Sequence, residues 1–253
     1  EVLLAAGHCV TIVDMRHPTI GLTVASRNGD KAVNLGQIIS KNVSLFSHLV
    51  KNSGVVEATG AQLSEGGVIR FIAQGDALVG GQVLAESTQG QGGEIDITGE
   101  RVAVLSGARV SADGATGGGT VHVGGGWKGQ DATLANAQQT VVQANTQISA
   151  NATVNGNGGE VVVWADGHTA VDSEVQAKGG ALGGNGGRVE TSGKQSLAVN
   201  VAANTSAAKG EAGQWLIDPA NLTIVAQASD APAGSFNLET QQPGPFFSTD
   251  DIS

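Results

Sequence analysis

A short motif, two glycines followed by apolar residues in alternate positions, recurs along most of the chain at a nearly constant spacing. Counted from the second glycine, successive copies lie 26, 26, 40, 28 and 26 residues apart. A second motif, an apolar residue two positions before an alanine, has intervals of 27, 27, 38, 27 and 26 residues. Both series lengthen at the same copy, which indicates one inserted loop in a regular array. The copies of the glycine motif lie at 66–71, 92–97, 118–123, 158–163, 186–191 and 212–217.

Each repeat contains three runs in which apolar and polar residues alternate, most clearly at 94–98, 101–105 and 108–112. Alternation with a period of two predicts strands with one buried face. The breaks between runs carry Gly, Asn, Asp and Ser, which favour turns. No apolar stripe with a helical period persists. Stacking of equivalent runs predicts an all-β chain folded as a parallel β-helix, with about 26 residues and three strands per rung and about nine rungs.

The composition fits a narrow solenoid. Glycine contributes 39 of 253 residues, and aromatic residues are only 3% of the chain, so the interior has to be thin and aliphatic. A β-propeller would need about 40 residues and four strands per repeat, and a β-sandwich needs no fixed period, so both are weaker alternatives.

The regularity of the repeats divides the chain into three parts. Residues 1–60 predict shorter or irregular rungs, and residues 61–225 predict regular β-helix with an inserted loop near 124–137. Alternation fades in residues 226–253, where Pro, Gly, Ser and Gln predict a linker or loop-rich tail.

Charge and cysteine content exclude several classes of protein. There are 13 Lys and Arg against 23 Asp and Glu, a net charge of −10, which argues against nucleic acid or an anionic membrane as partner. The sequence contains no apolar run of about 18 residues, so it predicts no membrane-spanning segment. The single cysteine, Cys9, allows no internal disulfide, and we expect it to be a buried free thiol.

Four segments resemble the filamentous-haemagglutinin family, the large exoproteins of bacterial two-partner secretion: residues 118–125, 157–166, 186–194 and 215–224. Residues 2–7 resemble the end of that family's amino-terminal secretion domain, whose Asn-Pro-Asn motifs are absent here. The resemblance therefore places the chain after that domain. It implies a right-handed β-helix, export through an outer-membrane transporter as partner, and a secreted, cell-surface location. It further implies a non-enzymatic role as the shaft of an adhesin or biofilm-matrix protein, without cofactor.

The inserted loop supplies the main candidates for ligand binding. Trp127 could stack on a sugar ring while Lys128, Gln130 and Asp131 bond hydroxyl groups. The alternative is that Trp127 anchors the loop to the rod. Trp164 points outward by alternation and either binds ligand or packs under a loop. The candidate ligands are a host receptor, a matrix protein or a polysaccharide, so a carbohydrate-binding module is the alternative function.

Two acidic clusters raise the alternative of a polysaccharide-degrading β-helix. One comprises Asp166, Asp172 and Glu174 and the other Glu94, Asp96 and Glu100, yet outward carboxylates are also the ordinary solvated face of a solenoid. The five histidines show no metal-ligand spacing, so no catalytic residue and no metal site is predicted. Candidate glycosylation sites are the Asn-x-Ser/Thr sequences at Asn42, Asn151, Asn204 and Asn221.

Overall fold

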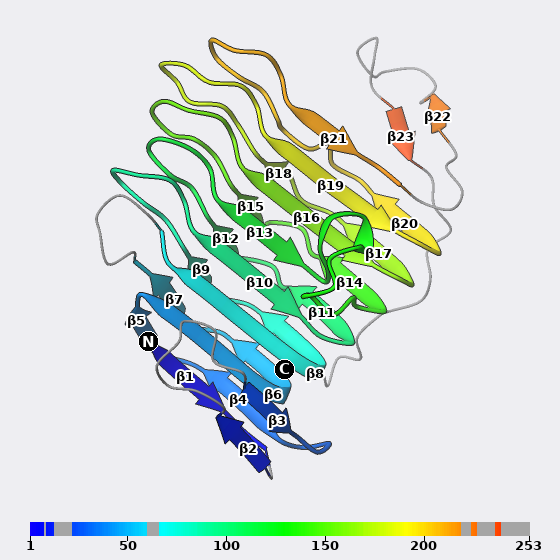
Figure 1. Cartoon of the computed structure of the whole chain (residues 1–253). Helices are drawn as coiled ribbons and strands as arrows, with labels where there is room; N and C mark the ends of the chain where they lie inside the picture. Colours follow the sequence, from blue (N-terminus) through cyan, green and yellow to red (C-terminus); the bar gives the residue numbers. More distant parts are fainter. Residues whose placement is uncertain (8, 13–21, 60–65, 219–223, 227–235, 239–253) are drawn as a thin grey trace.

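The repeats stack into three columns of parallel strands that wind around one narrow interior (Figure 1). The structure is a computed structural model that describes residues 1–7, 9–12, 22–59, 66–218, 224–226 and 236–238. A complete rung contributes one strand to each column, and we number the rungs by their column 1 strand. Column 1 consists of β1 (Val2–Ala5), the first part of β6 (Asn42–Asn52), the first part of β8 (Val68–Val79), β10 (Glu94–Thr98), β13 (Thr120–Val123), β16 (Glu160–Ala165), β19 (Arg188–Gly193) and β21 (Gln214–Leu216).

The other two columns complete each rung. Column 2 consists of β4 (Lys31–Asn34), the later parts of β6 and β8, β11 (Arg101–Val104), β14 (Gln139–Val142), β17 (His168–Val171) and β20 (Ser196–Val199). Column 3 consists of β5 (Gln37–Ser40), β7 (Val55–Ala58), β9 (Gln82–Leu84), β12 (Arg109–Ser111), β15 (Gln147–Ser149) and β18 (Val175–Gln176).

The strand register follows the spacing of the glycine motif. In column 1, Glu94 lies opposite Thr120, Thr120 opposite Glu160, and Glu160 opposite Arg188. The longest of these steps, from Thr120 to Glu160, spans the segment between β13 and β14. The predicted parallel β-helix is therefore confirmed, and the one helical element in the described residues is a short 3₁₀ turn, η1 (Trp127–Gly129).

The first rung is irregular because a hairpin leaves the rod between columns 1 and 2. The antiparallel strands β2 (Cys9–Ile12) and β3 (Leu22–Ala25) separate β1 from β4. As a result, the paired residues Val2 and Val43 of column 1 lie far apart in the sequence, whereas the paired residues Lys31 and Leu49 of column 2 lie much closer together. Because the rungs that carry the hairpin and the strap use more residues, the described residues form only seven rungs, and β21 begins an eighth. About nine rungs had been expected.

Two sequence expectations fall at the edge of the described structure. The structure places the backbone of Cys9 in β2, but the burial of its thiol lies outside what is described. In the tail, β22 (Ile224–Ala226) pairs with β23 (Phe236–Leu238), and the rest of residues 226–253 lies outside the described residues.

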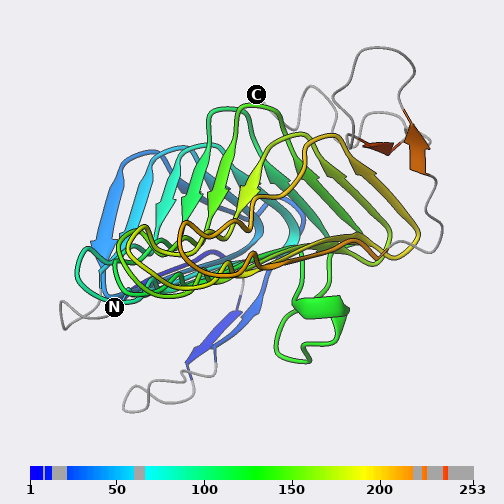
Figure 2. The same cartoon turned by 90° about the horizontal axis from the view of Figure 1, so that it is seen from above.

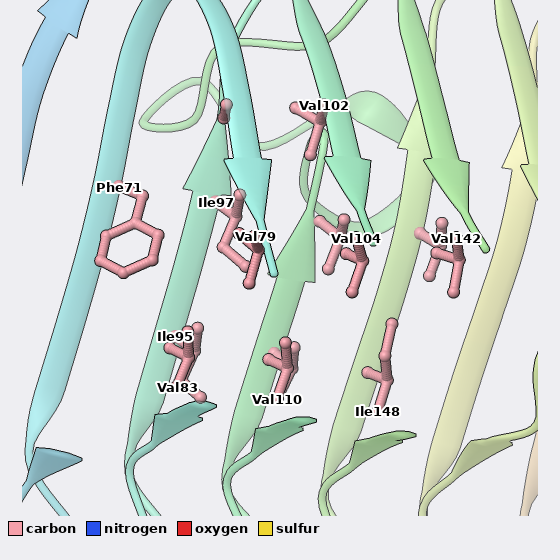
Figure 3. Close-up of a cluster of buried hydrophobic side chains, with 14 of the residues drawn as sticks. Phe71, Val79, Val83, Ile95, Ile97, Val102, Val104, Val110, Val142 and Ile148 are labelled. Atoms are coloured by element: carbon pink, nitrogen blue, oxygen red, sulfur yellow. The ribbon is translucent and has the colours of Figure 1, made fainter. Parts of the chain in front are cut away.

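The interior is built from columns of identical or similar aliphatic side chains. Ile69, Ile95, Val121, Val161 and Val189 succeed one another along column 1, each with no exposed area. Figure 3 shows the equivalent rows from all three columns converging, with Phe71 beside Ile97 and Val110 beside Ile148. Because each row continues into the next rung, every rung buries its apolar face only against its neighbours.

Candidate functional site

The segment Gly124–Gln138, which we call the strap, leaves the rod after β13 and returns at β14. Gly124 and Gly125 begin it with φ values of 82° and 154°, which side-chain-bearing residues rarely adopt. The backbone N–H of Ala137 donates to the carbonyl of Gly124 at 2.7 Å and closes the base of the strap. Figure 2 shows its 3₁₀ turn, η1, outside the stack of strands. The strap is therefore a defined structure that lies on the outer face of column 1.

Trp164 lies beneath the strap. Its neighbours Val163 and Ala165 belong to the core, so Trp164 faces outward as the alternation predicts, yet only 5% of it is exposed. A Cβ atom at Gly129 would lie 2.5 Å from the indole Cε2, so only a glycine allows this contact. The indole Nε1–H donates to Asp166 Oδ1 at 3.2 Å. The ring thus supports the strap and offers no open face to a ligand.

Trp127 and Lys128 fix the tip of the strap two rungs further along the rod. The guanidinium carbon of Arg188 lies 4.6 Å from the centroid of the Trp127 ring, within range of a cation–π interaction. The backbone N–H of Lys128, whose φ is 57°, donates to Glu190 Oε2 at 2.7 Å. Both partners belong to β19, whereas the strap starts from β13. The strap therefore joins rung 5 directly to rung 7.

The five predicted ligand-binding residues do not form one site. Lys128, Gln130 and Trp164 line a shallow hollow of about 410 Å³. Asp131 instead lines a second hollow, of about 420 Å³, on the other side of the strap. One carboxylate oxygen of Asp131 accepts hydrogen bonds from the backbone N–H and hydroxyl of Thr133, and these bonds lower its pKa. The predicted ligand-binding residues therefore lie in two separate hollows on either side of the strap. The remaining residues of the first hollow are Gly129, Asp166, Lys194 and Asp218.

A ladder of charged side chains crosses five rungs, 3 to 7, on the outer face of column 1. Arg70 pairs with Glu94 at 2.6 Å and with Asp96 at 3.2 Å. His122 continues the ladder, with Nδ1 2.8 Å from Asp96 Oδ1 and Nε2 3.2 Å from Glu160 Oε1. At the far end of the ladder, Glu160 pairs with Arg188, the residue that packs on the Trp127 ring. The members lie 24 to 38 residues apart where the structure brings them together, so only the register of the repeats could have revealed the ladder.

The ladder holds His122 in its charged form. The carboxylates of Asp96 and Glu160 outweigh burial and raise the pKa of His122 to about 9. Although burial opposes it, the bond from His122 lowers the pKa of Asp96. Burial and the adjacent Asp96 raise the pKa of Glu94. The three groups therefore form a compensated ion network.

We expect the substitution His122→Gln to destabilise the protein in a pH-dependent way. The folded pKa of about 9 exceeds the ordinary histidine pKa of 6.5, so the stabilisation is complete below pH 6.5 and disappears as the pH rises through 9. Near pH 6 the free energy of unfolding should fall by about 2–3 kcal/mol. Urea unfolding of both proteins at pH 6 and pH 10 tests this. An equal difference at the two pH values would contradict it.

All members of the acidic clusters except the exposed Glu100 are paired or hydrogen-bonded within the rod. Glu94 and Asp96 have the basic partners that the sequence did not reveal, Arg70 and His122. In the other cluster, Asp172 accepts a hydrogen bond from Asn200. Glu174 accepts bonds from Gln176 and Asn204. No group of three or more His, Cys, Asp or Glu in the described ranges is arranged to hold a metal ion.

The candidate glycosylation sites differ in exposure. Asn151 is only 7% exposed and both ends of its amide are used: Oδ1 accepts the N–H of Lys178, and Nδ2 donates to Gln176. Asn204 and Asn42 are half-buried, and Asn204 donates to Glu174. Asn221 lies outside the described residues. Asn151 therefore serves the stack of rungs in this structure.

Glu190 is a buried carboxylate beneath the tip of the strap. It has no exposed area, and its Oε1 has no hydrogen-bond partner in the described structure. Burial raises the pKa of Glu190, and the backbone N–H of Lys128 opposes this effect. Its ionised form therefore costs stability in the folded protein.

We expect Glu190→Gln to raise the melting temperature at pH 8 and to change it little at pH 4. The folded pKa of the acid is raised, so the penalty is absent below the ordinary glutamate pKa of 4.5, grows as the pH rises towards the folded pKa and is complete above it. Glutamine keeps an oxygen that accepts the Lys128 N–H without the charge. Thermal unfolding at both pH values tests this, with the exposed Glu211→Gln as control. A lower melting temperature at pH 8 would show that the charge itself holds the strap.

Comparison with known proteins gives a likeness to a solved structure. No protein-family model matches the chain, and no curated protein sequence does either. Among solved structures, the chain is similar to the HMW1 secretion domain from Haemophilus influenzae, with 29% sequence identity and a TM-score of 0.72. The match covers 85% of this chain, and the chain spans 57% of the length of that domain. The likeness supports a β-helical protein related to secreted adhesins, in line with the resemblance found in the sequence motifs.

Proposed function

We propose that this chain is a non-enzymatic β-helical segment of a bacterial adhesin that leaves the cell by two-partner secretion. The similarity to the HMW1 secretion domain over 85% of the chain carries the proposal. An outer-membrane transporter is its partner during export, and the stacked rungs form a stiff shaft that projects binding regions from the cell surface. No helix among the described residues is long and apolar enough to span a membrane.

The likeness also bears on where in the parent protein this segment belongs. The sequence motifs place it after the secretion domain, but the similar structure is itself a secretion domain. This favours a segment that includes the β-helical body of such a domain and continues as the shaft. The strap supports the role of a stiff shaft, because it fastens rung 5 to rung 7 and so adds a contact beyond the nearest neighbour.

A non-enzymatic role agrees with the state of the acidic groups. Glu94 and Asp96 are neutralised by Arg70 and His122, whereas a glycosidase needs two carboxyl groups that flank an open substrate site. The alternative of a carbohydrate-binding module on the strap is also weaker, since Arg188 covers a face of Trp127 and Trp164 is buried.

Export can be tested directly. The chain is fused behind the amino-terminal targeting region of a two-partner exoprotein and produced together with that exoprotein's transporter. We expect the fusion to reach the medium as a protease-resistant rod, and the same fusion without transporter to stay in the cell. Retention of the fusion in the periplasm despite an active transporter would count against the proposal.

The absence of enzymatic activity needs a separate assay. The purified chain is incubated with a panel of polysaccharides, and new reducing or unsaturated ends are measured over time. We expect no release above a heat-denatured sample. Sustained release that depends on Glu94 or Asp96 would establish the enzyme alternative instead.

A further inference from the structure

A polar groove runs along the corner where column 3 turns into column 1, crossing rungs 4 to 8. Its volume is about 810 Å³. Equivalent positions of successive rungs line it: the residue before each glycine pair, the pair itself and the residue after it. We call this feature the corner groove. It borders the strap hollow that Asp131 lines, with which it shares Thr120. The residues that precede the glycine pairs are Gln91, Gly117, Asn157 and Asn185. In rung 8, Glu211 takes the same place before Ala212-Gly213.

The backbone of the corner groove is already paired along the rod. Gly118 N–H donates to the carbonyl of Asn157 at 3.0 Å, and Gly158 N–H to that of Asn185 at 2.9 Å. Gly186 N–H donates in the same way to Glu211 at 2.8 Å. A peptide that binds by adding a strand needs a free edge of N–H and C=O groups. The corner groove has none at these positions, so its ligand has to be bound by side chains.

Two asparagine amides in the corner groove are oriented for such a ligand. Asn157 Oδ1 accepts the backbone N–H of Asn185 at 2.8 Å, and Asn185 Oδ1 accepts that of Glu211 at 3.0 Å. Because the oxygen of each amide accepts these bonds, the NH₂ group is the free end. Neither NH₂ group has a partner in the described part of the chain, and both side chains are exposed. The result is a pair of donors one rung, about 4.8 Å, apart.

The lining indicates the chemistry of the ligand. Ala212 is the one apolar side chain among the described residues of the corner groove, so a lipid or another aliphatic ligand would bury nothing. Glu160 and Glu211 outnumber Arg188, and the whole chain carries a charge of −10, which disfavours polyanions. The free NH₂ groups need an oxygen acceptor, so the ligand that fits the lining is a long neutral one rich in hydroxyl groups.

We propose that the corner groove binds a linear neutral polysaccharide lying parallel to the rod axis. Hydroxyl oxygens of the sugar accept hydrogen bonds from the NH₂ groups of Asn157 and Asn185, and a hydroxyl group donates to the carboxylate of Glu211. Equivalent positions recur at each rung, so successive sugar units meet successive rungs. This site goes beyond the proposed export function and does not depend on it.

The affinity of one chain segment is modest. No aromatic ring lines the corner groove among the described residues, and each neutral hydrogen bond with a sugar contributes little net affinity, because it replaces a bond with water. We expect dissociation constants of roughly 0.1–1 mM for oligosaccharides, with tighter binding as the oligosaccharide lengthens until it spans rungs 4 to 8.

The test measures binding of the purified chain to soluble linear glucan, mannan, galactan and xylan oligomers of increasing length by isothermal titration. An acidic uronan of equal length is the comparison. We expect at least one neutral series to bind with length-dependent affinity and the uronan not to bind. The double variant Asn157→Asp/Asn185→Asp should lose at least tenfold in affinity, because it keeps the oxygen that accepts each backbone N–H but replaces the free NH₂.

A matched control carries the same change of charge elsewhere. Gln147→Glu/Gln195→Glu alters two exposed residues that do not line the corner groove, and it should bind as the unaltered protein does. The melting temperature of both double variants is measured first. If the aspartate pair lowers it by more than a few degrees, the single variant Asn157→Asp takes its place.

Two results would overturn the proposal. One is the absence of binding to all four neutral series at millimolar concentration. The other is binding that survives Asn157→Asp/Asn185→Asp but is lost in Trp127→Ala, which would move the sugar site to the strap. Because export is measured by a different assay, failure of the corner groove leaves the export proposal intact, and the reverse also holds.

Discussion

In the variant Val161→Asp, rungs 5 to 7 are expected to stop folding as one cooperative unit. The free energy of unfolding should fall by about 4 kcal/mol or more. Val161 has no exposed area and lies between Val121 and Val189 in the interior row of column 1. A carboxylate there has no cation or donor within the aliphatic interior. Since each rung is stabilised by its neighbours, the damage spreads to the rungs on both sides.

Thermal unfolding and limited proteolysis measure this effect. The melting temperature should fall by about 10 °C or more, and cleavage should begin near rungs 5 to 7. Val154→Asp is the matched control, because Val154 is 47% exposed in a turn and the same substitution there should change little. Equal melting temperatures for Val161→Asp and the unaltered protein would show that the assigned strand register is wrong.

The second large effect is expected from Gly159→Ala, the smallest possible change at a rung corner. A Cβ atom at this position would lie 2.0 Å from the carbonyl oxygen of Gly119 in the preceding rung, which is backbone and has no rotamer to escape into. The corner has to open by more than an ångström, and the bond from Glu160 N–H to Gly119 O at 2.9 Å is strained as a result. We expect a loss of about 2–4 kcal/mol.

Gly36→Ala is the control for that variant. No atom lies within 4 Å of a Cβ built on Gly36, and its φ is not in the left-handed region. The alanine should therefore leave stability unchanged or raise it by up to about 1 kcal/mol, since it restricts the unfolded chain. Chemical denaturation of both variants gives the comparison. If the two glycines tolerate alanine equally, close stacking does not explain the paired glycines.

The periodic part of the molecule could be predicted because the interactions that build it repeat. Val121, Val161 and Val189 occupy the same place in successive rungs, so their spacing in the sequence is the register of the strands. A break in that spacing predicted the inserted loop. The outward direction of Trp164 followed from the alternation of β16.

The candidate site was less accessible to the same reasoning. Trp127, Lys128, Gln130 and Asp131 lie within five positions of the sequence, but they separate in space because the strap turns through η1, outside the stack of strands. The basic partners of Glu94 and Asp96 were missed for a related reason. Arg70 precedes Asp96 by one rung and His122 follows it by one, and no local pattern marks outward residues as partners.

By itself, then, the sequence determined the parallel β-helix, its thin aliphatic interior and the position of the inserted loop near 124–137. These follow from periodicity, which acts between every rung and the next. Only the tertiary structure decided that the strap fastens rung 5 to rung 7 through Arg188 and Glu190, and that Asn157 and Asn185 expose aligned NH₂ groups. Such contacts depend on how an irregular loop or an exposed side chain settles on the finished rod, and that is a property of the surface rather than of the repeat.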